Sequence, residues 1–260
     1  LRTAVMNWAT HAPLRIGLES SREGAHLACH TLIPDTGRLV PAHLRYWRVA
    51  ESLGMGHLRR QAQVATSDDD RAWVDDRLQG LPGAVLAVHP GAGWMTKRWP
   101  VEKFAVVASK AARRFGMSTV LVGSAAERPL TLQLEGLMRR FAPPARIVNL
   151  AGQTTLKQLA VVLGRSDVLL TNDSGPMHLA AAMGTPVVSA FTSTDPDRAG
   201  PAGSEHRLIA THVPCGGCYK KRCRYSGRKH LACLDELSTD RVWHALATHL
   251  QRRTAPDRAA

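Results

Sequence analysis

Short apolar runs alternate with longer amphipathic stretches between residues 84 and 191, and this alternation predicts an α/β fold. Each apolar run has the length of a buried strand, and each stretch between runs repeats its apolar positions with helical spacing. The predicted strands are AVLAVHP (84–90), STVLVGS (118–124), RIVNLAG (146–152), DVLLTNDS (167–174) and PVVSAF (186–191). The predicted helices are 101–116, 127–141, 155–166 and 175–184. Strands and helices in this order form a parallel sheet covered on both faces, so we expect a Rossmann-like domain with its ligand at the carboxyl ends of the strands.

The first 62 residues give a less regular pattern of the same kind. The predicted elements are a helix over 1–10, strands over 15–19 and 26–33, and a helix over 43–54 that Gly54 ends. The chain starts with Leu1, and no capping residue precedes the first helix. We therefore expect residues 1–62 to be the remnant of an amino-terminally truncated domain.

A linker is expected over residues 63–82, because an acidic stretch and the turn GLPG separate the two patterns. The stretch SDDDRAWVDD (67–76) indicates a solvated helix start with Ser67 as its cap. We assign no catalytic role to its aspartates. The sequence then predicts a ligand-binding domain over 83–236 and a final helix over 237–252.

The charge of the chain favours an anionic partner. Lysine and arginine number 34 against 21 acidic residues, which gives a formal net charge of +13. Nucleic acid, acidic lipid, a phosphorylated glycan and a nucleotide all fit this sign, whereas 5 % aromatic content argues against stacking on single strands. No apolar run approaches the roughly 20 residues that span a bilayer. A reducing, cytoplasmic compartment is the simplest expectation for a chain whose cysteines crowd into one segment.

The motif TNDSGPMH (171–178) stands where a predicted strand ends and a helix begins. Gly175 lets a ligand approach the backbone, and the free amides and dipole of the helix start favour an anion such as phosphate. His178 can point the same way. In the alternative interpretation, Asp173 and Ser174 only cap the helix and His178 packs beneath it.

Two further loops are predicted at the same edge of the sheet. HPGAGWMTKRWP (89–100) offers glycines, Thr96 and Lys97 for a phosphate, although it is neither a Walker motif nor a dinucleotide fingerprint. In VGSAAERP (122–129), Glu127 can accept both hydroxyls of a ribose. The alternatives are a lone surface lysine at Lys97, tryptophans that only pack, and a simple acid at a helix start for Glu127.

These loops, together with LAGQTTLKQLAVVLGRSDVLLTNDSGPMHLAAAMGTPVVSAF (150–191) and TDPDRAGP (194–201), resemble glycosyltransferase family 9, the bacterial lipopolysaccharide heptosyltransferases. The resemblance implies a GT-B fold of two facing Rossmann-like domains. It makes 1–62 part of the acceptor domain and 83–236 the donor domain, with a cysteine-rich loop over 214–233. The helix at 237–252 then resembles the element that crosses back onto the first domain.

Site residues follow from the same resemblance. Lys97 neutralises the diphosphate of ADP-heptose and stabilises departing ADP, Glu127 holds the ribose, and Thr154 lines the adenine pocket. Asp173, Ser174, Gly175 and His178 match a motif in which amides and histidine meet the phosphates and the aspartate faces the sugar. Some relatives carry hydroxyl side chains where this loop has Ala92 and Gly93, which leaves backbone amides and Thr96 to contact the phosphates.

The resemblance also implies an inverting transfer without a metal, because a lysine and helix amides stabilise the leaving diphosphate. We expect Lys97 and Asp173 to be the catalytic residues of this chain. The family places its general base, an aspartate, in a loop that precedes Leu1 here, so we expect the fragment to be inactive alone. The resemblance implies that the acceptor is the lipopolysaccharide inner core, at a cytoplasmic site peripheral to an anionic inner membrane.

The segment PCGGCYKKRCRYSGRKHLAC (214–233) leaves three alternatives open. Its thiols Cys215, Cys218, Cys223 and Cys233 can hold a structural zinc, stay free or redox-sensitive, or bind an iron–sulfur cluster. Two other functions also remain: a GT-B enzyme that uses a UDP or GDP sugar, and a basic zinc-dependent module that binds nucleic acid. We favour the heptosyltransferase, with no nucleic-acid partner, because the nucleic-acid module leaves the three loops unused. The base pocket near Thr154 and a test of nucleotide preference separate the heptosyltransferase from an enzyme that uses a UDP or GDP sugar.

Overall fold

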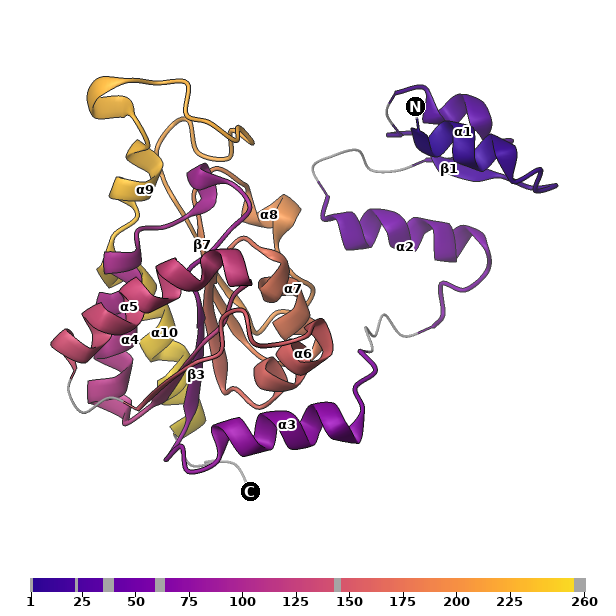
Figure 1. Ribbon diagram of the computed structural model, residues 1–260. Helices are drawn as coiled ribbons and strands as arrows, with labels where there is room; N and C mark the ends of the chain where they lie inside the picture. Colours follow the sequence, from indigo (N-terminus) through magenta and orange to yellow (C-terminus); the bar gives the residue numbers. More distant parts are fainter. Residues whose placement is uncertain (1, 22, 35–39, 59–63, 143–145, 255–260) are drawn as a thin grey trace. The chain divides into compact units, whose positions relative to one another are not determined.

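The computed structural model describes residues 2–21, 23–34, 40–58, 64–142 and 146–254 (Figure 1). The chain divides into two compact units. One comprises Leu1–Gln61 with Asp197–Ala199, and the other comprises Ala62–Pro196 with Gly200–Ala260. None of the helices in the described part has the length and apolar content that crossing a bilayer requires.

The first unit is a small α/β body. Its elements are α1 (Arg2–Ala9), β1 (Ile16–Leu18), the 3₁₀ turn η1 (Ala25–Ala28), β2 (Thr31–Ile33) and α2 (Ala42–Ser52). Strands β1 and β2 pair in parallel, with Ile16 opposite Thr31. The strand predicted over residues 26–33 is shorter in the structure. Residues 25–28 form the turn η1, and only Thr31–Ile33 belong to a strand. Gly54 follows α2 with φ of +77°, a conformation that glycine adopts readily at a helix end.

The second unit contains a parallel six-stranded sheet. Its strands are β3 (Val85–His89), β4 (Ser118–Leu121), β5 (Ile147–Asn149), β6 (Val168–Asn172), β7 (Val187–Phe191) and β8 (Arg207–Ala210). They lie in the order β5-β4-β3-β6-β7-β8, and every neighbouring pair is parallel. The chain starts in the middle, builds outward to β5 and then returns to the other side of β3. A crevice for ligand lies at this reversal, between the carboxyl ends of β3 and β6.

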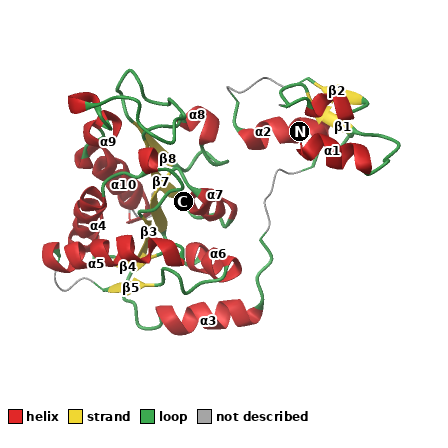
Figure 2. Cartoon of the chain, turned by 45° about the horizontal axis from the view of Figure 1, so that its top comes forward, coloured by secondary structure: helices red, strands yellow, loops and turns green. Residues whose placement is uncertain are grey.

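Helices cover both faces of this sheet, as the alternation predicted (Figure 2). The helices of this unit are α3 (Asp68–Leu78), α4 (Val101–Phe115), α5 (Arg128–Phe141), α6 (Leu156–Gly164), α7 (Gly175–Ala182), α9 (Ala232–Glu236) and α10 (Thr239–Thr254). Helix α8 (Pro196–Ala199) belongs, apart from Pro196, to the segment grouped with the first unit. Short 3₁₀ turns are η3 (Met95–Lys97), η4 (Ala125–Glu127) and η5 (Gly227–Lys229). The prediction of a Rossmann-like domain is confirmed.

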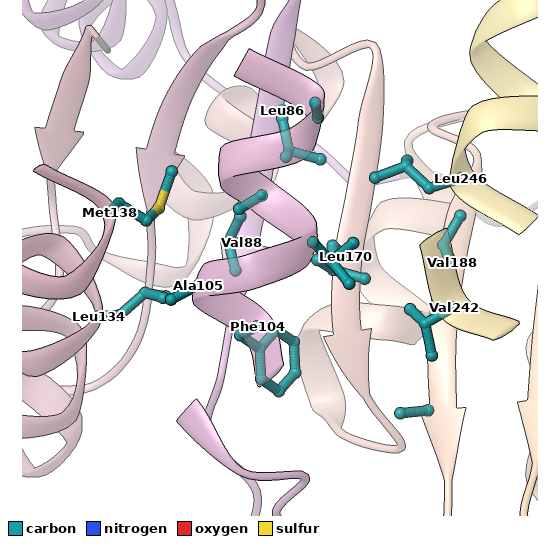
Figure 3. Close-up of a cluster of buried hydrophobic side chains, with 14 of the residues drawn as sticks. Leu86, Val88, Phe104, Ala105, Leu134, Met138, Leu170, Val188, Val242 and Leu246 are labelled. Carbon is teal, nitrogen blue, oxygen red and sulfur yellow. The ribbon is translucent and has the colours of Figure 1, made fainter. Parts of the chain in front are cut away.

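The main core lies between the sheet and α4, α5 and α10. Figure 3 shows Phe104 of α4 and Leu170 of β6 within it, with Val242 of α10 close to β7. Leu86 and Val88 of β3 point into this core because alternate side chains of a strand share a face. Each such side chain contributes about 1.5–3 kcal/mol when fully buried.

Helix α3 lies within the segment 63–82 that we expected to be a linker. Ser67 caps it, since its hydroxyl accepts from the Asp70 amide while Asp70 bonds back to the Ser67 amide. Val74 is fully buried against the other face of the sheet, in one cluster with Val120 and Val161. Trp73 and Leu78 pack on the same cluster, but only Val74 of α3 is fully buried and the helix is mostly charged. Its apolar positions gave no clear periodic signal, which is why the packing of α3 was not predicted.

Candidate functional site

A cavity of about 600 Å³ opens at the carboxyl ends of β3, β4 and β6. A volume of this size suits a small-molecule ligand. Eight of the nine residues predicted to bind substrate line it: Gly93, Lys97, Glu127, Thr154, Asp173, Ser174, Gly175 and His178. The three loops therefore meet in one place, because the parallel strands bring their carboxyl ends to the same edge.

Thr96 is the exception among the predicted residues. It is buried, and its hydroxyl donates to the Lys220 carbonyl at 2.6 Å. Its own carbonyl accepts from the Thr192 hydroxyl at 2.7 Å. The Thr96 side chain thus fastens η3 to the cysteine-rich loop and faces away from the cavity. A phosphate contact by this hydroxyl does not fit the structure.

Lys97 and Asp173 form an ion pair inside the cavity. The Lys97 ammonium lies 2.7 Å from Oδ2 of Asp173, with side chains 18 % and 6 % exposed. The same ammonium lies 4.7 Å from the centre of the Trp94 ring, within range of a cation–π contact. Two catalytic candidates predicted from separate motifs are therefore in direct contact, across the reversal point of the sheet.

Asn172 fixes the loop that carries Lys97. Its amide nitrogen donates to the carbonyls of Pro90 and Gly91 at 2.8 and 3.1 Å, and its oxygen accepts from the Trp99 amide at 3.0 Å. All of these contacts are buried. One side chain at the end of β6 therefore satisfies three backbone groups of the loop after β3, which would otherwise be buried without partners.

Ser174 occupies the position before α7 but makes no side-chain hydrogen bond that caps it. Its hydroxyl lies instead 3.2 Å from Nδ1 of His89 and 3.1 Å from the Thr171 hydroxyl. Gly175 and Pro176 then begin the helix at the cavity wall. The start of α7 consequently presents its positive dipole end to the cavity without a carboxylate or hydroxyl cap.

Glu127 is held by the turn that precedes α5. Its Oε2 accepts from the Ser124 amide at 2.9 Å and from the Ser124 hydroxyl at 2.8 Å, and Nε2 of His89 lies 3.5 Å away. The hydrogen bond from His89 is the main cause that lowers the pKa of Glu127 to about 2, against burial, which raises it. The side chain is therefore a carboxylate at neutral pH, with Oε2 occupied by these donors.

Gly91 allows this arrangement by having no side chain. A Cβ at position 91 would lie 1.9 Å from Oε1 of Glu127 and 3.0 Å from Nε2 of His89. Distances this short are steric overlaps. The motif HPGAG was noted for its glycines, but the sequence did not indicate that Gly91 makes room for the carboxylate of another loop.

Apolar side chains form one wall of the cavity near Thr154. Leu156 and Leu159 of α6 line it together with Thr155. Thr155 caps α6, since its hydroxyl accepts from the Gln158 amide while Gln158 bonds back to the Thr155 amide. Leu156 is 71 % exposed, so part of its apolar side chain is open to a molecule in the cavity. The helical pattern of this segment gave no reason to single out either leucine.

His89 also lines the cavity. It begins the motif HPGAGWMTKRWP, but the sequence gave it no predicted role. It is the last residue of β3 and only 3 % exposed. Its position directly after an apolar run, at the same edge as the three motifs, was the available signal. A histidine there is as consistent with packing as with function, so only the structure shows that it touches two of the loops.

The four clustered cysteines line one small cavity of about 20 Å³. All are free thiols, and in the described ranges no three histidine, cysteine or acidic side chains are arranged to hold a metal ion. As placed, the thiols do not fit a tetrahedral zinc site. Amides of Leu231 and Tyr225 lower the pKa of Cys223, whereas burial raises the pKa of Cys233 to about 11.

The cysteine-rich loop lies against the loop that carries Lys97. Besides the Thr96 hydrogen bond, the Lys221 ammonium lies 5.8 Å from the centre of the Trp94 ring. The Tyr219 amide donates to the Ser193 carbonyl at 2.7 Å. The loop also carries a run of exposed basic side chains: Lys220, Lys221, Arg222, Arg224, Arg228 and Lys229.

Comparison with known proteins gives a consistent result. The sequence model of glycosyltransferase family 9 (heptosyltransferase) matches residues 1–229. The lipopolysaccharide core heptosyltransferase OpsX of Haemophilus influenzae is 26 % identical, over 81 % of this chain and 60 % of its own length. The chain thus spans about three fifths of that relative.

Two solved structures share the fold over nearly the whole chain. The family 9 glycosyl transferase from Veillonella parvula has a TM-score of 0.80 at 25 % identity, covering 96 % of this chain and 71 % of that one. The ADP-heptose lipopolysaccharide heptosyltransferase II of E. coli has a TM-score of 0.73 at 24 % identity, covering 98 % and 75 %. Given the family match over residues 1–229, the chain belongs to glycosyltransferase family 9, the heptosyltransferase family.

Proposed function

We propose that the chain binds ADP-heptose and is part of an enzyme that transfers heptose to the inner core of lipopolysaccharide. The observation that carries this proposal is the meeting of Lys97, Glu127 and the start of α7 in one cavity. A cation, a carboxylate and a helix amino terminus are the groups that a nucleoside diphosphate needs. Family membership and the names of OpsX and the E. coli enzyme support the choice of sugar and acceptor.

The proposed orientation of the donor follows from the groups that line the cavity. The ribose hydroxyls donate to Oε1 of Glu127, because Oε2 is already occupied by Ser124. The diphosphate lies between Lys97 and the amides at the start of α7, with His178 beside it. The adenine packs on the apolar wall near Thr154, where Leu156 and Leu159 provide the surface.

The chemistry assigned to these residues is electrostatic. Negative charge develops on the diphosphate as the bond to the sugar breaks, and Lys97 with the α7 dipole stabilises that charge. Such stabilisation lets an inverting transfer proceed without a divalent cation. Asp173, held 2.7 Å from Lys97, fixes the ammonium and faces the sugar. We assign the general base to none of the described residues.

The exposed basic run on the cysteine-rich loop is the proposed contact with an anionic surface. Lys220, Lys221 and Arg222 follow one another, and Thr96 connects their loop to the turn η3 that carries Lys97. Each basic side chain near an anionic membrane contributes about 1 kcal/mol. This supports a location peripheral to the inner membrane, where a phosphorylated acceptor is presented.

Calorimetric titration with ADP, UDP and GDP tests the proposal, with Lys97→Ala and Lys110→Ala as paired variants. Lys110 lies on α4 and pairs with Asp240 at 3.1 Å, outside the cavity. We expect preference for ADP, a loss of about tenfold or more in Lys97→Ala, and no change in Lys110→Ala. Preference for UDP or GDP would keep the fold and overturn the donor. No binding by a folded chain would overturn the proposal.

A further inference from the structure

His89 contacts two loops of the cavity, the one that carries Ser174 and the one that carries Glu127, but it has no role in the proposed binding of the donor. Its ring is buried at the end of β3, with the side chain 4 % exposed. Nδ1 lies 3.2 Å from the Ser174 hydroxyl and 3.3 Å from the Thr171 hydroxyl. Nε2 lies 3.5 Å from Oε2 of Glu127, in the loop after β4. A buried polar ring of this kind is held by its hydrogen bonds rather than by packing alone.

The partners decide which ring nitrogen carries the proton in the neutral ring. Glu127 is ionised, and a carboxylate only accepts hydrogen bonds, so Nε2 must be the donor. Nδ1 is then an acceptor, and the Ser174 hydroxyl donates to it. This bond turns the Ser174 side chain toward the ring, which agrees with the absence of a side-chain cap at the start of α7.

The same ring limits how Glu127 can turn. Oε2 is surrounded by Ser124 and His89, so Oε1 is the oxygen that faces the space left by Gly91. Without the ring, the carboxylate retains Ser124 as a partner but loses the contact on its buried side. It then has freedom to rotate between the turn and the cavity.

We propose that His89 is a positioning residue that sets the selectivity of the cavity for a nucleotide with an intact ribose, by holding Glu127 and Ser174 at once. The inference rests on the proposed function, since it takes Glu127 as the ribose-binding group. His89 itself does not touch the reacting atoms. Its effect is therefore expected in the discrimination between ribose and deoxyribose more than in overall stability.

Two conservative variants separate the contact made by Nε2 from the contact made by Nδ1. His89→Gln places an amide donor near the position of Nε2 and keeps the contact with Glu127. His89→Asn reaches only the position of Nδ1 and keeps the contact with Ser174. The measurement is the ratio of dissociation constants for 2′-deoxy-ADP and ADP, obtained by calorimetry on the whole chain.

We expect this ratio to be about tenfold or more in the parent chain, because a hydrogen bond to a carboxylate is lost. In His89→Asn it should fall below about threefold, with ADP binding weakened toward that of the deoxy ligand. His89→Gln should restore the ratio to within about twofold of the parent. Such rescue by an amide at one position is not expected of a residue that only fills space.

His206→Asn is the matched control for losing a buried histidine. His206 is 7 % exposed and accepts from the Val187 amide at 3.2 Å, at the opposite end of the sheet. The variant His206→Asn should lower the free energy of unfolding without changing the ratio of dissociation constants for 2′-deoxy-ADP and ADP. An unchanged ratio in His89→Asn, or an equal fall in His206→Asn, would overturn the inference while ADP binding by the parent still supported the proposed function. A parent chain without ADP binding would sink both.

Discussion

The Lys97 ammonium lies 2.7 Å from Oδ2 of Asp173, so the cation assigned to the diphosphate is paired with a carboxylate of the same cavity. ADP must compete with this carboxylate for Lys97 and is also repelled by it. We therefore expect Asp173→Asn to bind ADP more tightly, by up to about tenfold. Titrations at low and high salt measure the effect, which should shrink as salt screens it.

The control for this charge change is Asp240→Asn, which removes a carboxylate from a surface pair with Lys110. It should leave ADP affinity unchanged. Weaker ADP binding in Asp173→Asn would mean that the carboxylate orients Lys97 more than it competes with the ligand.

Gly91 should not tolerate a side chain. A Cβ there overlaps Oε1 of Glu127 at 1.9 Å, and Glu127 is held in place by Ser124. Gly91→Ala is expected to reduce ADP affinity by about tenfold or more, because the ribose-binding oxygen is displaced. Gly136→Ala on α5, where an added Cβ meets nothing within 4 Å, is the paired variant and should be neutral for binding. Equal affinities in the two variants would show that Glu127 moves without consequence.

Glu127 should give the chain an acid-dependent stability. Its folded-state pKa of about 2 lies below the ordinary 4.5, chiefly because of the His89 hydrogen bond. A depressed carboxyl pKa stabilises the folded state above the unfolded pKa, and that contribution is lost as pH falls from about 4.5 toward 2. Urea unfolding of the parent and Glu127→Gln should therefore differ more at pH 6 than at pH 3. A pH-independent difference would contradict this assignment.

Asn172 should be the side chain on which the Lys97 loop depends most. It satisfies the carbonyls of Pro90 and Gly91 and the Trp99 amide. Asn172→Asp sets a carboxylate against two carbonyls, and we expect a loss of about 2 kcal/mol or more in the free energy of unfolding. Gln153→Ala, which removes one exposed hydrogen bond to the Asn149 carbonyl, should cost less than about 1 kcal/mol. Urea denaturation compares the two, and similar losses would argue against the assigned role.

The clustered thiols should react at very different rates. Cys223 has a lowered pKa because the Leu231 and Tyr225 amides bond to its sulfur, whereas burial raises the pKa of Cys233 to about 11. Thiolate is the reactive form, so alkylation near pH 7.5 should modify Cys223 and the exposed Cys218 well before Cys233. Mass spectrometry of timed samples resolves the sites. Equal protection of all four thiols, released by a chelator, would instead indicate a bound metal.

The sheet could be predicted because its apolar runs are long and its helices are amphipathic. The location of the site could be predicted from the sheet, because the carboxyl ends of parallel strands place Lys97, Glu127 and Asp173 at one edge. Strand β8 was missed because RLIA is short, starts with a charged residue and lies half-buried at the edge of the sheet.

Side-chain partners were harder to foresee than positions. Thr96 looked like a phosphate contact, but its hydroxyl turns to the Lys220 carbonyl, more than one hundred residues further along the chain. The contact between His89 and Glu127 likewise depends on the strand order, which the sequence pattern leaves open. Local periodicity determines which residues reach an edge, whereas long-range packing determines which of them meet.

The pairing of β3 with β6 also constrains when the cavity can form during synthesis. His89 stands opposite Thr171, 82 residues later, and β6 must be in place before the loops after both strands can meet. Contacts of such long separation form slowly compared with local ones. A growing polypeptide should therefore gain its nucleotide pocket only after β6 and the start of α7 have left the ribosome, long after β3 and β4 could pair.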